Sequence, residues 1–416
     1  MVVALGILLG LPATLFVGYL ILLLVGGLIP FSAPPAPVLS ASRGTGEPVH
    51  LSPERSSDPT VPPNGGRDGG GGGIAVLIPA HDEELVIEST LQSVFAQTLP
   101  PAAVYVIADN CTDKTAELAR AMGTTVLERT DTENRGKGWA LAWAFERLLR
   151  ETDYPAFVIL DADTHAAPDF CERIADQLAA YGPDDEVAIQ GRYGVLNEND
   201  GWRAALMSAA FALVNHIRLA GADRLGGFVG LKGNGMAFTR ALLLAHPWNG
   251  SSITEDLDYA LDLDRAGVRL RYAPEARVAA QMPVDARAAA TQRRRWEGGR
   301  AQLALARGGA MLKARRIWAA MDLLTPPLGE LCGLVLLWGL LTPFTPMWLA
   351  LWWAAVTGGL ILYVLGGLLI SGVSGRVWVA LACAPFYVAW KLAQRLTKPS
   401  REWIRTNRIP TGGPRP

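Results

Sequence analysis

The chain begins with an apolar run that is too long to pack on a water-soluble domain. Residues Val2 to Ile29 contain no charged side chain, and about 20 apolar residues are enough to cross a bilayer. A cleaved signal peptide has a positive start and a shorter apolar core, but here no Lys or Arg precedes Arg43. We therefore predict an uncleaved transmembrane anchor over residues 1–30. Because Arg43 and Arg55 follow it, the N-terminus should lie outside and the bulk of the chain inside, in the cytoplasm.

The composition supports a membrane protein and excludes some other classes. Half of the residues are hydrophobic and the mean hydropathy is +0.21, both high for a soluble enzyme. The net charge of −1 gives no indication of nucleic-acid binding. The four cysteines form no CxxC pair, so neither a zinc site nor a disulfide framework is indicated, and thiols fit a reducing compartment. They are Cys111, Cys171, Cys332 and Cys383.

Residues 31–73 are rich in Pro, Gly and Ser and end in a run of glycines. Such a segment cannot bury a core, so we predict a disordered linker. A glycine-rich phosphate loop is the alternative, but the run lacks the Lys-Ser/Thr ending and no strand precedes it.

From residue 74 onward, short apolar runs alternate with segments of helical periodicity. This order predicts an α/β domain with a mostly parallel sheet covered on both faces. Ligands of such sheets bind at the carboxyl ends of the strands. The predicted strands are Ile74–Pro79, Val104–Ala108, Thr125–Glu128 and Phe157–Leu160, and the predicted helices are Glu83–Gln97, Asp113–Met122 and Gly138–Arg150.

The chain becomes apolar again over residues 323–394, which we predict to be a C-terminal transmembrane region. Pro326 and Pro327 interrupt its first segment, and Glu330 would cost about 2.5–3.5 kcal/mol at a bilayer centre. We therefore expect two true crossings, with the first or last segment lying in the interface. The basic tail, residues 395–416, should be cytoplasmic. The three apolar segments are Leu323–Leu341, Met347–Ile370 and Val377–Trp390.

Two carboxylates directly follow the most apolar predicted strand. Asp161 and Asp163 stand at i and i+2 after Phe157–Leu160, where both can reach one ligand. A Mg²⁺ or Mn²⁺ ion held between carboxylates and a diphosphate would neutralise the charge that builds up on the departing phosphate. A solvated acidic turn is the alternative, but the position at the end of a buried strand favours the metal site.

Two further groups suit a nucleotide. Asp109 ends the second predicted strand, where its carboxylate can accept the ring N–H of a pyrimidine base, although it could equally cap the next helix, a role we give to Asp113. Lys137, in the segment Asn134-Arg135-Gly136-Lys137-Gly138, can counter phosphate charge. By itself this segment is also compatible with a plain turn before a helix.

A second acidic group lies far along the sequence, at Glu255 and Asp256. In one interpretation Thr254 caps a helix and the two acids favour its first turn. In the other, Asp256 is a general base that removes a proton from an acceptor hydroxyl, with Glu255 beside it. Direct displacement at a sugar carbon requires such a base on the face opposite the leaving group.

A basic stretch follows the acidic one. Gln292, Arg295 and Trp296 could clamp a ligand, because Arg binds phosphate and Trp stacks on sugar rings, or they could belong to a helix on the membrane surface. Residues 301–322 combine basic and apolar side chains, which predicts an amphipathic interfacial helix on an anionic leaflet.

Taken together, these residues resemble family 2 glycosyltransferases of the GT-A fold, especially the membrane-embedded branch that includes cellulose, chitin, hyaluronan and poly-N-acetylglucosamine synthases. The resemblance covers residues 74–300 and implies donor binding by Pro79, Asp82 and Glu83 in the opening loop, where the family usually has Asn-Glu-Glu. It also implies an acceptor-side role for Asn234. The other matching motifs are Asp109, Asp161-Ala162-Asp163, Thr254-Glu255-Asp256 and Gln292-Arg293-Arg294-Arg295-Trp296.

The resemblance implies an inverting hexosyltransferase that uses a nucleotide diphosphate sugar, UDP-linked in most of the family, and a divalent metal. The acceptor would be a polysaccharide or glycolipid at the cytoplasmic face of the membrane. The chain departs from the processive enzymes in its short membrane region, which argues against a translocation channel. Two alternatives stay open: transfer to a polyprenyl phosphate, and a non-catalytic membrane-anchored sugar-nucleotide sensor.

Overall fold

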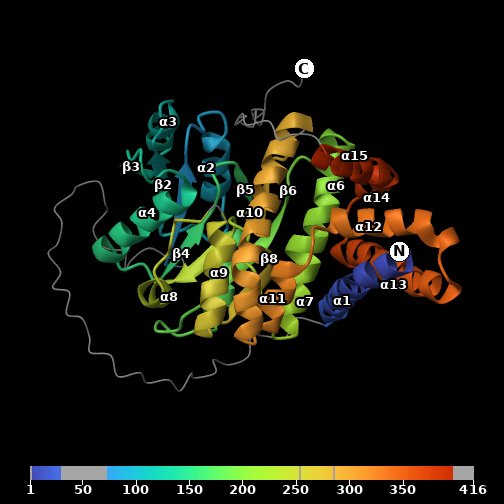
Figure 1. Cartoon of the computed structure of the whole chain (residues 1–416). Coiled ribbons are helices and arrows are strands. Elements are labelled where there is room, and N and C mark those ends of the chain that lie inside the picture. The colour runs from blue at the N-terminus through green and yellow to red at the C-terminus, as the bar shows by residue number, and fades with distance from the viewer. Residues whose placement is uncertain (1, 30–72, 253, 284–285, 397–416) are drawn as a thin grey trace.

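A computed structural model describes residues 2–29, 73–252, 254–283 and 286–396. A mixed sheet with its covering helices forms one side of the molecule, and long apolar helices form the other (Figure 1). The predicted linker at residues 31–73, apart from Gly73, and the basic tail from residue 397 lie outside the described residues.

The first half of the sheet is parallel, as the alternating sequence pattern predicts. Its strands run in the order β3-β2-β1-β4, and each neighbouring pair is parallel. The parallel arrangement brings their carboxyl ends to one edge of the sheet. The strands are β1 (Ile74–Ala80), β2 (Ala103–Asp109), β3 (Thr125–Arg129) and β4 (Ala156–Ile159), and the helices between them are α2 (Ile87–Phe95), α3 (Thr115–Ala121) and α4 (Lys137–Glu151).

The second half of the sheet is mixed. From β4 the order continues β7-β6-β8-β5; β4 pairs with β7, β7 with β6 and β8 with β5 antiparallel, whereas β6 and β8 are parallel. The strands are β5 (Thr164–Ala166), β6 (Ala188–Val195), β7 (Met236–Thr239) and β8 (Leu270–Ala280). The accompanying helices are α5 (Phe170–Leu178), η1 (Glu198–Asp200), α8 (Arg240–Ala245) and α9 (Glu255–Ala266).

Both faces of the sheet are buried, in two separate apolar clusters. On one face Val76 and Val158 pack with residues of α2 and α5. On the other, Leu77 and Phe238 belong to a cluster that extends through α7 (Arg218–Arg224) into the apolar helices at the chain ends. The sheet half and the helical half of the molecule therefore share one continuous core.

A nearly straight helical rod spans residues 202–224 and was not foreseen from the sequence. It consists of α6 (Trp202–Phe211), the π-helical turn η2 (Ala212–Ile217) and α7 (Arg218–Arg224). By length and apolar composition it qualifies as a candidate membrane span, although about two thirds of it is buried inside the protein. Its contacts with α1 (Val2–Leu28) and α13 (Met347–Ser371) join the sheet to the apolar helices.

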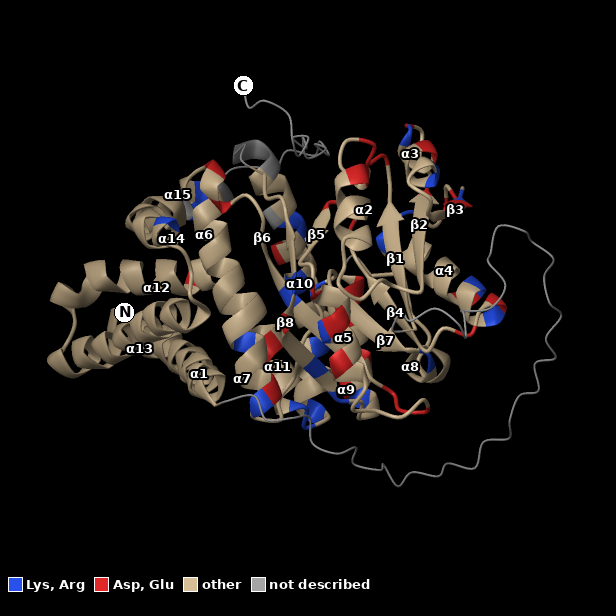
Figure 2. Cartoon of the chain, turned by 180° about the vertical axis from the view of Figure 1, so that it is seen from behind, with Lys and Arg blue, Asp and Glu red and all other residues tan. Residues whose placement is uncertain are grey.

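Three helices of the described chain are long and apolar enough to cross a membrane: α1 (Val2–Leu28), the 202–224 rod and α13 (Met347–Ser371). The sequences of α1 and α13 contain no charged residue, and both appear uniformly tan in Figure 2. The helices α11 (Ile317–Leu324) and α12 (Leu328–Leu341), with η3 (Thr342–Phe344), form a fourth candidate that is bent by 65°. The bend falls at Pro326 and Pro327, where the sequence predicts an interruption. The chain continues through α14 (Gly375–Ala380), η4 (Leu381–Cys383) and α15 (Ala384–Leu396).

The boundaries predicted around residue 300 differ from the structure. Helix α10 runs without a break over Ala286–Lys313, so position 300 lies inside a helix, and the segment 301–322 is divided by a turn at Arg315, which has φ 58°. The basic side chains of the segment 301–322 are also less available to bind lipid than the sequence predicts. Arg307 forms ion pairs with two aspartates of α9, because α10 docks on that helix.

The crossing of α1 and α7 gives a prediction. A Cβ on Gly221 would lie 2.0 Å from the carbonyl oxygen of Leu23, so Gly221→Ala should separate the helices. We expect a loss of about 1–3 kcal/mol of unfolding free energy, seen as a lower thermal midpoint in detergent. Gly18→Ala is the matched control, since nothing lies within 4 Å of that position. Equal midpoints for the two variants would contradict the tight crossing.

Candidate functional site

The Asp161–Asp163 segment forms a tight turn between β4 and β5. The backbone N–H of Thr164 donates to the carbonyl of Asp161 at 3.0 Å, which closes the turn. The hydroxyl of Thr90 donates to the carbonyl of Ala162 at 2.7 Å, which ties the turn to α2. Both carboxylates are thereby carried on a braced turn at the carboxyl edge of the sheet.

Asn234 is a brace for this turn. Its Oδ1 accepts from the backbone N–H of Asp161 at 3.2 Å, and its Nδ2 donates to the hydroxyl of Thr164 at 2.8 Å. Gln190 donates to the carbonyl of Asn234 at 2.8 Å. Because Asn234 is fully buried and its side chain is engaged in this way, the geometry supports a positioning role and not the acceptor contact expected from the sequence.

Lys137, the first residue of α4, connects the turn to the loop before β7. Its ammonium donates to Oδ1 of Asp161 and to the carbonyl of Gly233. Burial alone would lower the pKa of Lys137, but the charges of Asp161 and Glu255 outweigh it and the pKa is raised. Lys137 therefore stays protonated, as its predicted role of countering phosphate charge would require.

Glu255 and Asp256 open α9 on the other side of Lys137. A Cβ placed on Gly233 would lie 3.3 Å from Oδ2 of Asp256 and 3.6 Å from Nζ of Lys137. The carboxylate of Asp256 and the ammonium of Lys137 therefore both lie close to this glycine. Burial and the neighbouring Asp256 raise the pKa of Glu255 to about 7, and burial raises that of Asp256. Thr254 occupies the N-cap position of α9, but its hydroxyl makes no capping hydrogen bond.

The position of Lys137 depends on a close contact between two loops. A Cβ on Gly250 would lie 2.3 Å from the carbonyl carbon of Gly138, so Gly250→Ala must shift the start of α4. A displacement of about 1 Å near a reacting centre can cost roughly 100-fold in rate. We expect at least a tenfold loss of turnover, together with a loss of about 1–3 kcal/mol of unfolding free energy from the same backbone contact. Wild-type turnover would contradict this coupling.

Asp109 is held in place by Arg129, which no sequence motif indicated. Its Oδ1 pairs with Nη1 of Arg129 at 2.6 Å and accepts from the amide of Asn110 at 3.1 Å. Arg129 stands in register with Asp109 on the neighbouring strand, which only the pairing of β2 with β3 reveals. Contact with a base stays a prediction for Asp109 and would use its other oxygen.

The opening loop after β1 packs against the loop after β2. Pro79 is buried within β1, and the backbone N–H of Glu83 donates to the hydroxyl of Thr115 at 2.8 Å. Asp82 has φ 53° and accepts from the backbone N–H of Thr112 at 2.7 Å. Asp113 accepts from the N–H of Thr115, the first residue of α3, but Lys114 occupies the N-cap position of that helix, so the predicted capping role of Asp113 is not confirmed.

Among the described residues, Asp82, Cys111 and Asp113 form a group of three possible metal ligands within 4.8 Å of one another. The two carboxylates already accept hydrogen bonds that join the two loops, including one from the N–H of Glu84 to Asp113. Burial raises the pKa of the Cys111 thiol, which favours its protonated form. This group therefore holds loops together and is a poor match for a metal.

The Gln292–Trp296 segment lies on α10 and reaches the Asp161 turn through aromatic rings. Trp296 contacts Phe211 at 6.2 Å between ring centroids, and Phe211 contacts Tyr193 at 5.1 Å. Tyr193 in turn hydrogen bonds with Asn234. Arg295 is exposed, and Gln292 is half-buried. Trp296 thus packs against aromatic residues that adjoin the site. Stacking of Trp296 on a sugar stays a prediction.

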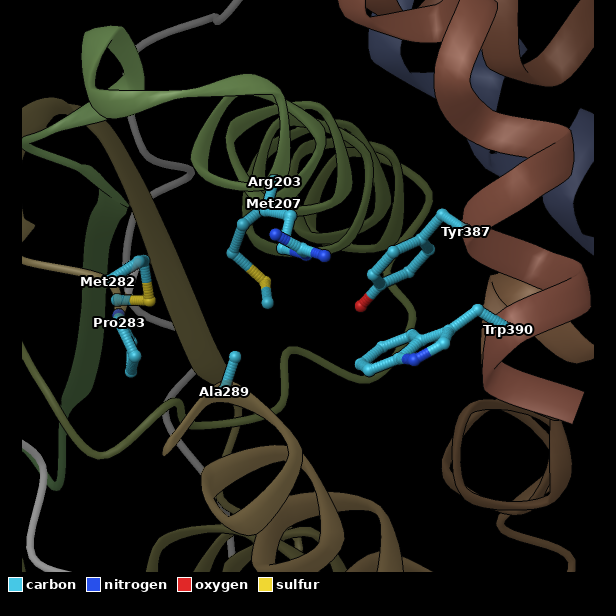
Figure 3. A pocket seen from close by; sticks show the side chains of 7 residues that line it. All are labelled: Arg203, Met207, Met282, Pro283, Ala289, Tyr387 and Trp390. Carbon is cyan, nitrogen blue, oxygen red and sulfur yellow. The ribbon is translucent and has the colours of Figure 1, made fainter. Parts of the chain in front are cut away.

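A small apolar pocket opens beside the start of α10 (Figure 3). The guanidinium of Arg203 lies 4.5 Å from the ring centroid of Trp202 and 6.0 Å from that of Trp390. None of the described residues that line this pocket is a carboxylate or belongs to the acidic site. Its lining is Arg203, Met207, Met282, Pro283, Ala289, Tyr387 and Trp390.

The sequence comparison with known families agrees with this arrangement. The profile described as "Glycosyltransferase like family 2" matches residues 71–299, more than half of the chain. The chain belongs to glycosyltransferase family 2. The match covers the whole sheet and the acidic site, and the mixed sheet with its parallel first half is the GT-A arrangement expected from the sequence.

Several curated proteins are similar over the same region. Glucomannan 4-beta-mannosyltransferase 7 of Arabidopsis thaliana is 24% identical over 59% of this chain and 45% of its own length. Poly-beta-1,6-N-acetyl-D-glucosamine synthase of Staphylococcus aureus is 26% identical over 59% of this chain and 58% of its own. The chain thus spans about half the length of the curated relatives it matches.

Among solved structures, a mannosyltransferase from Pyrobaculum calidifontis in complex with GDP-Man and Mn²⁺ matches 76% of this chain and 90% of its own, with 19% identity and a TM-score of 0.42. Glucosyl-3-phosphoglycerate synthase from Mycobacterium tuberculosis matches 53% of this chain and 78% of its own, with 21% identity and a TM-score of 0.34.

Proposed function

We propose that this glycosyltransferase moves a hexose, with inversion, from a nucleotide diphosphate sugar to a polysaccharide or glycolipid acceptor at the cytoplasmic face of the membrane. The observation that carries the proposal is the approach of Lys137, which is bound to Asp161, and of Asp256 to the same residue, Gly233. Segments more than 90 residues apart thus supply a phosphate-binding cation and a proton acceptor to one site.

The residues present fit a divalent metal at the Asp161 turn. Asp161, Glu255 and Asp256 act electrostatically on the single ammonium of Lys137, so negative charge is in excess. Mg²⁺ and Mn²⁺ favour one or two carboxylates together with substrate phosphates, and Asp161 and Asp163 offer two. When bound, the ion would neutralise charge on the diphosphate. The residues that would hold it are Asp163 and Asp161.

Asp256 is the group we propose as the base. A hydroxyl of the acceptor gives its proton to the Asp256 carboxylate, and its oxygen forms a bond to the anomeric carbon. The bond from that carbon to the diphosphate oxygen breaks, and the nucleoside diphosphate leaves with the electron pair, next to Lys137. Burial, which raises the pKa of Asp256, makes its carboxylate a better proton acceptor.

The membrane arrangement supports an acceptor of the cell envelope. Helices α1 and α13 are suited to cross a bilayer, and the sheet shares its core with them. Because Arg43 and Arg55 follow α1, the proposed site faces the cytoplasm, where nucleotide sugars are made. A UDP-sugar is the proposed donor, and Asp109 the proposed contact for its base.

A panel of sugar nucleotides tests the proposal directly. The purified full chain is incubated with each donor and Mn²⁺, with and without a membrane extract, and release of the nucleoside diphosphate is measured. We expect release with one donor, stimulated by the extract. Binding of a donor without release, under all conditions, would instead favour the sugar-nucleotide sensor.

A further inference from the structure

A buried cluster of charges lies between the acidic site and the membrane helices. Asp322 of α11 is 2% exposed and pairs with Nε of Arg218 at 2.7 Å and with Nη2 of Arg300 at 3.1 Å. Arg218 belongs to the 202–224 rod and Arg300 to α10. The backbone carbonyl of Asp322 also accepts from both guanidinium groups. Three helices are thus joined at one carboxylate.

Lys232 extends this cluster toward Asp256. The backbone N–H of Lys232 donates a hydrogen bond to Oε1 of Gln190 at 2.7 Å. A Cβ on Gly230 would lie 3.7 Å from Nζ of Lys232 and 3.5 Å from Leu257, the residue after Asp256. The charges of Asp322, Arg300, Arg218 and Asp256 all act on this ammonium. Within the described parts of the chain, no carboxylate lies within ion-pair distance of it.

The cluster contains more positive than negative charge. Lys232, Arg218 and Arg300 are three cations, and Asp322 pairs with the two arginines but not with Lys232. Burial lowers the pKa of Lys232 to about 8, so the side chain is still mostly protonated at pH 7. Arg218 is buried, whereas Lys232 and Arg300 are half-buried and reach the surface, where a bound anion would offset the excess positive charge.

The position of Lys232 distinguishes this anion from the diphosphate of the sugar donor. Lys137 is bound to Asp161 of the turn after β4, whereas the charge of Asp322 on α11 acts on Lys232. An inverting base faces away from the leaving group, so an anion at Lys232 belongs to the acceptor.

We propose that Lys232 and Arg300 form a phosphate subsite for an acceptor that enters from the membrane and presents a hydroxyl to Asp256. That this ligand is the acceptor rests on the proposed function. The ligand is a phosphate-bearing lipid or lipid-linked sugar, since α7, α10 and α11 bring the cluster to the membrane side. Arg218 and Asp322 position the guanidinium of Arg300.

Direct binding tests the subsite without turnover. The full chain in phosphatidylcholine nanodiscs is titrated with radiolabelled dodecyl phosphate, with dodecyl glucoside as the neutral probe and glycerol 3-phosphate as the soluble one. We expect Lys232→Met to bind dodecyl phosphate about 10- to 100-fold more weakly, as for the loss of one charge-assisted hydrogen bond. Lys232→Arg should restore much of the affinity, and dodecyl glucoside should not respond to either change.

Lys313→Met is the matched control, because Lys313 is an exposed cation at the end of α10 and lies outside the cluster. Unchanged nucleotide binding by each variant verifies the fold. Wild-type affinity of Lys232→Met, or an equal loss in Lys313→Met, would overturn the subsite. Glycerol 3-phosphate binding as tightly as dodecyl phosphate would overturn the membrane source. Failure of the donor panel, with Lys232-dependent binding retained, would reject only the proposed transfer reaction.

Discussion

Replacing Asp256 by Asn should abolish sugar transfer and leave nucleotide binding intact. The amide has nearly the same shape but cannot accept a proton, and general base catalysis contributes about 10²- to 10⁴-fold to rate. Nucleotide binding should persist, since Lys137 stays bound to Asp161 and Gly233. Turnover is measured as release of nucleoside diphosphate, and binding by titration calorimetry with UDP and Mn²⁺.

Asp258→Asn is the control for this experiment. Asp258 lies in the first turn of the same helix, but its carboxylate pairs with Arg307 at 2.8 Å and does not reach the site. We expect this variant to retain most of its turnover. Robust transfer by Asp256→Asn would remove the base assignment, and the polyprenyl phosphate acceptor, which needs no strong base, would then be favoured.

Replacing Asp163 by Ala should abolish the dependence of UDP binding on metal. A divalent ion bound by two carboxylates and a diphosphate loses one of its two protein ligands in this variant. We expect UDP affinity to fall about tenfold or more in the presence of Mn²⁺ and to be unchanged in the presence of a chelator. Transfer should fall with it, because the leaving diphosphate is less well neutralised.

The control for Asp163→Ala is Asp169→Ala, just before α5. Asp169 forms an i,i+4 ion pair with Arg173, and such pairs contribute little to stability. Its loss should leave UDP affinity as in the wild type. If Asp163→Ala binds UDP with unchanged metal dependence, the metal is held elsewhere or is not required.

The first half of the fold could be predicted from the sequence because each strand there is a continuous apolar run ended by polar residues. The predicted strand Val104–Ala108 differs from β2 by one residue at each end. The second half could not, since β6 and β8 mix polar and apolar residues and pair across long stretches of chain. The 202–224 rod was missed because its polar residues hide an otherwise apolar helix.

The candidate site was foreseen as a set of residues, but not as a set of contacts. A motif places Asp161, Lys137 and Asp256 near one ligand, but the bond between Lys137 and Asp161 appears only when α4 and β4 are packed together. Arg129 and Lys232 follow no motif, because strand register and helix packing, which the sequence does not display, give them their neighbours.

The continuous core between the sheet and the apolar helices has a practical consequence. A fragment beginning at β1 and ending near residue 300 would lose α1 and α13, the partners of the 202–224 rod. Leu213, Ile217 and Leu219 are each at most 1% exposed in the intact chain, and much of their surroundings would be replaced by water. Such a truncated enzyme should aggregate on expression, so preparations for biochemistry need detergent or lipid from the first extraction step.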